Sequence, residues 1–157
     1  MKYFKTVPSP TALLAHSIID VIIHLFLTLV ISGIIYLQSR NLSYAALFIA
    51  GGVFVDLDHF IDYFLYHKLN FSVKDFFSCG NLKSGKVYLV FHSWEINLFL
   101  LLLSRVFNSP QLLLLGLGLS LHLGIDNLQR ENPWCYFLVY RMLKRFESKV
   151  LVPEFMV

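Results

Sequence analysis

Long apolar stretches alternate with short polar connections along this chain. Four stretches approach the roughly 20 consecutive apolar residues that a bilayer-spanning helix needs. They cover residues 11–37, 43–66, 87–107 and 109–128. Only the segment 68–86 forms a long polar connection, in which Gly80 and Gly85 interrupt the apolar pattern. The pattern predicts an all-α, integral membrane four-helix bundle that forms a single membrane domain over residues 1–157.

The residues after the fourth stretch mix aromatic and basic side chains. Segment 133–150 contains Trp134 and Tyr140 beside Arg141 and Lys144. Such a mixture is typical of a helix that lies in the membrane interface, with its rings at headgroup depth and its cations toward anionic lipid. We therefore expect a C-terminal interfacial amphipathic helix over 133–150, with a solvated tail as the alternative.

Composition supports a membrane protein and excludes some other classes. The chain is 57% hydrophobic and only 15% charged, and its formal net charge is +3. This modest charge, without a basic and aromatic stripe, argues against nucleic acid and leaves membrane lipid as the expected partner. Cys79 and Cys135 lie far apart without CxxC spacing, so we expect reduced thiols rather than a disulfide or a zinc site.

Lysine and arginine predict how the chain is oriented in the membrane. All of them except Arg40 and Arg105 lie before the first stretch, within 68–86, or after the fourth stretch. Positive residues concentrate in cytoplasmic segments. We therefore expect a multi-pass protein of the cell inner (plasma) membrane with both termini and the 68–86 connection in the cytoplasm.

Ionisable side chains recur inside the predicted spans, where each costs several kcal/mol unless it is paired or binds an ion. They are His16, Asp20 and His24 in the first span; Asp56, Asp58, His59 and Asp62 in the second; His92 and Glu95 in the third; and His122 and Asp126 in the fourth. The orientation inferred from lysine and arginine brings all four groups to the cytoplasmic side, with His24 about 12 Å deeper than His16. The sequence therefore predicts one layer of histidines and carboxylates.

This layer predicts a divalent metal site. The expected metal ligands are His16, Asp20, Asp56, His59, Asp62, His92, His122 and Asp126. A nitrogen and oxygen set without thiolate suits zinc first, with manganese or iron as alternatives, and the number of groups allows one or two ions. A structural polar network or an ion pathway is the competing interpretation.

Further residues have expected catalytic or substrate-binding roles. An unligated carboxylate, Glu95 or Asp58, could act as the general base. Lys83, Lys86 and Arg130 are nearby cations that could hold a substrate phosphate, although each also fits a plain positive-inside charge.

Three motifs carry a resemblance to a known family. The DxDHxxD run from Asp56 to Asp62, the pair His92-Ser93 and the HxxxD pair of His122 and Asp126 resemble the membrane-bound metal-dependent hydrolase family, which includes LexA-regulated inner-membrane members. The resemblance implies that these motifs occur on membrane helices in this order, with His16 as the early histidine. Val55 replaces the proline that commonly precedes the first motif, and the HRGxTHS motif is shortened to its final His-Ser.

These observations predict a membrane metal-dependent hydrolase that acts on a lipid or lipid-linked phosphoester. A site at headgroup depth meets such substrates by lateral diffusion. A metal or proton transporter is an alternative, although the outer halves of the spans beyond His24 are almost wholly apolar. A non-catalytic assembly protein that metal merely stabilises is the other alternative.

Overall fold

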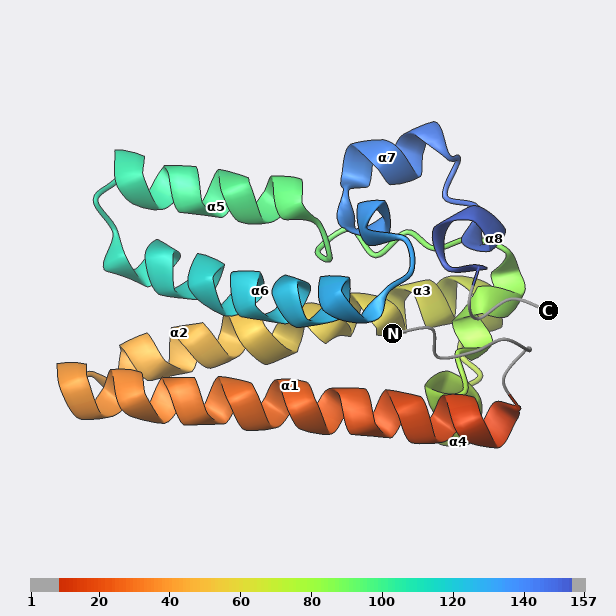
Figure 1. The fold of residues 1–157 in the computed structure, drawn as a ribbon, viewed down its shortest axis with the longest axis horizontal. Coiled ribbons are helices and arrows are strands. Elements are labelled where there is room, and N and C mark those ends of the chain that lie inside the picture. Colours follow the sequence, from red (N-terminus) through yellow and green to blue (C-terminus); the bar gives the residue numbers. More distant parts are fainter. Residues whose placement is uncertain (1–8, 154–157) are drawn as a thin grey trace.

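The computed structural model describes residues 9–153, apart from the side chains of Pro10 and Asn81, and contains no strand within that range (Figure 1). Its elements are α1 (Pro10–Ser39), α2 (Leu42–Val53), η1 (Phe54–Asp56), α3 (Leu57–His67), α4 (Val73–Phe77), η2 (Gly80–Ser84), α5 (Trp94–Val106), α6 (Pro110–Gln129), η3 (Pro133–Tyr136), α7 (Leu138–Leu143) and α8 (Ser148–Leu151). The predicted all-helical class is confirmed.

The long helices lie side by side with α2 and α6 in the centre (Figure 1). Helix α1 packs on the outer side of α2, and α5 packs on the outer side of α6. Most contacts between the long helices therefore run along a row, and the predicted four-helix bundle is not confirmed.

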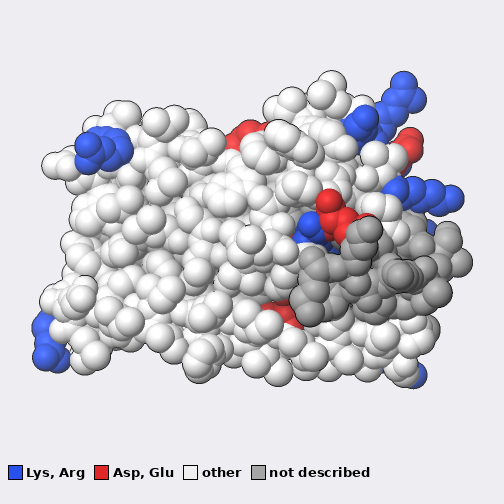
Figure 2. All heavy atoms as spheres, viewed as in Figure 1, with Lys and Arg blue, Asp and Glu red and all other residues white. Residues whose placement is uncertain are grey.

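Three helical segments are long and apolar enough to cross a membrane. They are Thr11–Ser39, Leu42–His67 and Pro110–Gln129, the second of which combines α2, η1 and α3. The side chains of Ile22, Phe26 and Leu37 on α1 are 58%, 64% and 62% exposed, as expected of a lipid-facing surface. In Figure 2 most of the visible lysine and arginine side chains lie toward the two ends of the long axis. The surface between them is largely uncharged apart from a few acidic side chains, which is compatible with a bilayer.

The third predicted span is wrong at its start. Residues 87–93 are not helical, and α5 begins at Trp94 and has only 13 residues. Such a helix is about 20 Å long, short of the roughly 30 Å hydrocarbon core. The N–H groups of Tyr88, Phe91 and His92 donate to the carboxylates of Asp58 and Asp62 instead of extending the helix.

The predicted interfacial helix over 133–150 is also wrong in form, because the chain there divides into η3, α7 and α8. Arg145 and Phe146 adopt positive φ angles of 53° and 58°, which ends the helix after α7. Val87 N–H donates to Phe146 O at 2.9 Å, so this C-terminal cap, residues 133–152, folds over the start of segment 87–93. Arg141, expected to face lipid headgroups, is only 2% exposed.

Glycines allow α2 and α6 to approach closely. A Cβ atom on Gly51 would lie 2.1 Å from the carbonyl oxygen of Leu115, and one on Gly118 would lie 2.2 Å from that of Phe48. Neither position has room for a side chain, and small residues of this kind bring membrane helices into backbone contact. The close approach positions the carbonyl oxygen of Gly52 against His122 of α6.

Candidate metal centre

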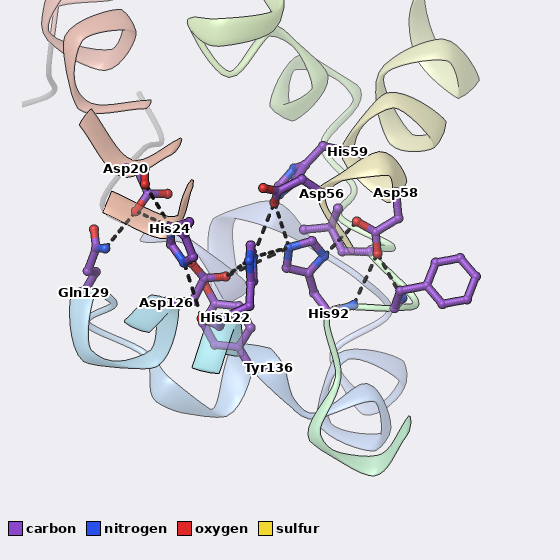
Figure 3. A network of polar contacts seen from close by, with 12 residues as sticks. Asp20, His24, Asp56, Asp58, His59, His92, His122, Asp126, Gln129 and Tyr136 are labelled. Atoms are coloured by element: carbon purple, nitrogen blue, oxygen red, sulfur yellow. Dashed lines mark hydrogen bonds and ion pairs between the residues drawn. The ribbon is translucent and has the colours of Figure 1, made fainter. Parts of the chain in front are cut away.

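Three side chains from three elements meet at one point (Figure 3). Asp56 comes from η1, His122 from α6, and His92 from the non-helical segment before α5. The Nε2 atoms of His92 and His122 are 3.2 Å apart. Asp56 Oδ1 lies 3.2 Å from the His92 Nε2 atom and 3.4 Å from the His122 Nε2 atom. These three atoms form a nearly regular triangle.

The size of this triangle matches a tetrahedral metal site. With metal–ligand bonds of about 2.0–2.1 Å to nitrogen and oxygen, neighbouring ligand atoms of a tetrahedral zinc ion lie about 3.3 Å apart. Asp126 lies beside this triangle, with its Oδ2 atom 3.5 Å from His122 Nε2 and 4.0 Å from His92 Nε2. Asp56, His92 and His122 could therefore hold a metal ion with Asp126 beside it.

A backbone carbonyl orients the His122 ring. The Nδ1 atom of His122 lies 3.0 Å from Gly52 O, which can only accept, so the proton is on Nδ1 and donates to that oxygen. The lone pair of Nε2 is then directed into the triangle. A ligating imidazole usually has its second nitrogen held in this way.

Asp58 supports His92 rather than joining the triangle. Its Oδ1 atom lies 2.7 Å from the Nδ1 atom of His92, and its Oδ2 atom accepts the N–H groups of Phe91 and His92 at 2.9 and 3.2 Å. Asp62 acts nearby, where its Oδ2 atom accepts the N–H of Tyr88 at 2.8 Å. Both carboxylates therefore hold the segment that carries His92.

Arg141 of the C-terminal cap secures the same segment from the other side. Its guanidinium donates to the carbonyl oxygens of Tyr88, Leu89 and His92. Three carbonyl oxygens of a segment without helical hydrogen bonds thereby have partners, as burial of backbone groups requires. The sequence placed Arg141 at the lipid surface and offered no signal for this role.

His24 is a buried member of the site that the predicted ligand set omits. It is 3% exposed, and its Nε2 atom lies 3.1 Å from Asp126 Oδ1. Its Nδ1–H donates to the carbonyl oxygen of Asp20 at 2.9 Å, and the Asp20 carboxylate accepts from Gln129 at 2.7 Å. The i, i+4 spacing of Asp20 and His24 was the signal that could have included His24.

The other predicted ligands lie farther from the triangle. His59 is at its edge, with Nε2 3.8 Å from Asp56 Oδ1 and its ring 4.8 Å from the His92 ring, centroid to centroid. His16 is two helical turns before His24 on α1, about 12 Å along the axis. Of the predicted ligands, the structure brings Asp56, His92, His122 and Asp126 close together. It keeps His16 away from them.

Glu95, a predicted general base, has its carboxylate bound elsewhere. Its two oxygens accept the N–H groups of Leu138 and Val139 at 2.9 and 3.0 Å. The N–H groups in the first turn of a helix have no partner within the helix, and a carboxylate commonly accepts from them. Glu95 thus joins α5 to the C-terminal cap.

The three predicted phosphate-binding cations have different surroundings. Lys83 donates to Asp75, and this contact holds the pKa of the Asp75 carboxyl below its usual value. Lys86 donates to the carbonyl oxygen of Arg145 at 2.7 Å. Arg130, the C-cap of α6, lines a small cavity together with His92 and Asp126.

Two other groups in this cluster could also hold a metal ion, namely His24 with His122 and Asp126, and Asp58 with His59 and His92. His122 and His92 are each shared with the first triangle, so the groups compete for ligands. The 2.7 Å between His92 Nδ1 and Asp58 Oδ1 is short for two ligands of one tetrahedral ion. The triangle of Asp56, His92 and His122 is therefore the best-formed candidate.

Comparisons with protein-family models, curated proteins and solved structures found no match to this chain. Its function therefore has to be argued from the chemistry of the site itself.

Proposed function

We propose that this chain is an integral membrane metal-dependent hydrolase acting on a lipid or lipid-linked phosphoester. The observation that carries the proposal is the triangle of Asp56, His92 and His122 with edges of 3.2–3.4 Å. Two imidazoles and one carboxylate form the ligand type of many catalytic zinc sites. We assign zinc on this basis, with manganese or iron as alternatives.

A zinc ion here would supply a nucleophile near neutral pH and stabilise charge on a phosphoryl oxygen. We assign the general base to Asp126, which lines the neighbouring cavity and has its other oxygen against His24. Asp58 and Glu95 already accept backbone N–H groups, so we give them positioning roles.

The depth of the site supports a membrane substrate. Asp126 and His122 lie about 5 and 10 Å from the C-terminal end of α6, at 1.5 Å per residue. Because α6 is long enough to span the bilayer, this depth is near the headgroups, where a phosphoester can arrive by lateral diffusion. Lysine and arginine are concentrated before the first apolar stretch, in 68–86 and after the fourth stretch. This distribution favours an orientation in which the site and both chain termini are on the cytoplasmic side of an inner (plasma) membrane.

Metal content and hydrolysis together test this function. We would measure both for the detergent-purified wild type, Asp56→Ala and His122→Ala, with His67→Ala as the control, since His67 pairs with Asp75 outside the site. We expect about one zinc per chain and phosphoester hydrolysis in the wild type and the control, with both reduced at least roughly tenfold in the two site variants. Wild-type metal content and activity in both site variants would contradict the proposal.

A non-catalytic, metal-stabilised membrane protein is the second candidate. The presence of Asp126 beside His122 and His92 favours it, because Asp126 could supply a fourth ligand and structural zinc sites have four protein ligands. In that case the wild type would contain zinc and lack hydrolysis of every phosphoester tested.

A further inference from the structure

A small cavity borders the candidate metal centre on the side of the C-terminal cap. Its volume is about 30 Å³, and His92 and Asp126 form part of its wall. The remaining wall includes Arg130, Tyr136 and Arg141 among apolar side chains such as Val87 and Leu151. Because a cavity of roughly 10–15 Å³ already holds one water molecule, this one has room for one or two water molecules or ligand oxygen atoms.

Arg141 brings an unused donor to this cavity. The residue is 2% exposed, and its two terminal nitrogens donate to backbone carbonyl oxygens. Its Nε atom, in contrast, is buried and has no hydrogen-bond partner within residues 9–153. Buried N–H groups of a guanidinium are nearly always paired, so an unpaired one in a residue that lines a cavity points to a ligand oxygen.

Arg130 and Tyr136 form a second donor group on the same wall. The Nε–H of Arg130 donates to the Tyr136 hydroxyl oxygen at 3.1 Å, which leaves the hydroxyl proton available for another acceptor. Burial raises the pKa of Tyr136 well above its usual value, so the hydroxyl stays protonated. Tyr136 lies next to His122 and Asp126 in Figure 3, so this donor group adjoins the triangle.

We propose that Arg130, Tyr136 and Arg141 form an oxyanion subsite that binds one nonbridging oxygen of a phosphate whose other oxygens face the metal centre. The proposal rests on the proposed function and makes it specific: the substrate presents a phosphate to the metal centre, with its organic group on the side away from the C-terminal cap. Two guanidinium groups in a largely apolar wall suit an anionic oxygen better than a neutral carbonyl.

Binding of inorganic phosphate tests the subsite. We would titrate the zinc-loaded, full-length protein in detergent with phosphate by isothermal calorimetry, and measure zinc content in the same samples. The variants are Arg130→Gln and Tyr136→Phe, and the control is Lys149→Gln, which removes one positive charge from an exposed position of the same cap. Sulfate serves as a competitor to separate a general anion site from one that prefers phosphate.

We expect the phosphate Kd to rise at least roughly tenfold in Arg130→Gln and about threefold in Tyr136→Phe, with no change in Lys149→Gln and no loss of zinc in any variant. An unchanged Kd in Arg130→Gln with zinc retained would overturn the subsite, because phosphate would then bind through the metal alone. Absence of phosphate binding to the zinc-loaded wild type would overturn it too, as would sulfate binding of equal affinity. Arg130-dependent phosphate binding without hydrolysis would uphold the subsite and contradict the hydrolase function instead.

Discussion

Asp58 contacts His92 at two points and the neighbouring Phe91 at a third, without reaching the triangle itself. One oxygen lies 2.7 Å from the ring nitrogen Nδ1, and the other accepts the N–H groups of Phe91 and His92. The carboxylate thus holds the backbone of a candidate ligand and lies in close contact with its ring. Partners of this kind commonly change metal affinity by about 10–100-fold.

Replacing Asp58 by asparagine tests this role. The change keeps the size of the side chain but removes the charge beside the His92 ring, so we expect zinc affinity to fall roughly tenfold or more while some binding persists. Competition with a chelating dye measures the effect. Asp75→Asn is the matched control because Asp75 pairs with Lys83 and His67 away from the site. Equal affinities in the wild type and Asp58→Asn would remove the assigned role.

At the scale of helices, the α2–α6 contact determines where His122 lies. Gly51 and Gly118 let the two backbones touch, and the carbonyl oxygen of Gly52 then accepts from the His122 ring. A side chain at this contact would have to push the helices apart, because the nearest atoms belong to the backbone. Helix packing and ligand geometry are therefore coupled.

Gly118→Ala should disturb both properties. Its Cβ atom would lie 2.2 Å from Phe48 O, and overpacking of this kind typically costs about 1–3 kcal/mol in the free energy of unfolding. We also expect weaker zinc binding, because Gly52 O and His122 would separate. Gly124→Ala on the same helix is the control, since no atom lies within 4 Å of the place that its added methyl group would take. Thermal unfolding in detergent and a zinc titration measure the two effects, and equal behaviour of the two variants would refute the coupling.

At the scale of the whole molecule, the site joins parts that are far apart in the sequence. His24 comes from α1, Asp56 from η1, His92 from the segment before α5, and His122 from α6. Glu95 and Arg141 then connect the C-terminal cap to α5 and to the His92 segment. A metal ion bound here would link most of the fold, so its binding free energy would contribute to folding stability.

Metal removal should therefore destabilise the protein as a whole. At a free zinc concentration of about 100 Kd, binding to the folded state alone stabilises by roughly 2.7 kcal/mol. We expect a chelator to lower the Tm of the detergent-solubilised wild type and added zinc to restore it. His122→Ala should show neither response, and a chelator effect of equal size in that variant would place the responsible ion elsewhere.

The sequence alone determined the elements that apolar length and charge govern. The apolar stretches 11–37 and 109–128 agree closely with α1 and α6, because a long uninterrupted apolar run has few other stable forms. The positions of His122 and Asp126 along α6 likewise set the depth of these two side chains. Local sequence is sufficient for these features because helix geometry fixes the depth of each residue.

Only the tertiary structure decided the form of segment 87–93 and the role of each carboxylate. Val87, Leu89 and Val90 are apolar enough to continue a helix, yet Asp58, Asp62 and Arg141 bind the backbone groups of this segment from other elements. Asp56 and Asp58 are two residues apart and carry the same side chain. Asp56 forms a corner of the triangle, whereas Asp58 accepts the backbone N–H of His92. Such differences depend on partners distant in the sequence, which local pattern does not contain.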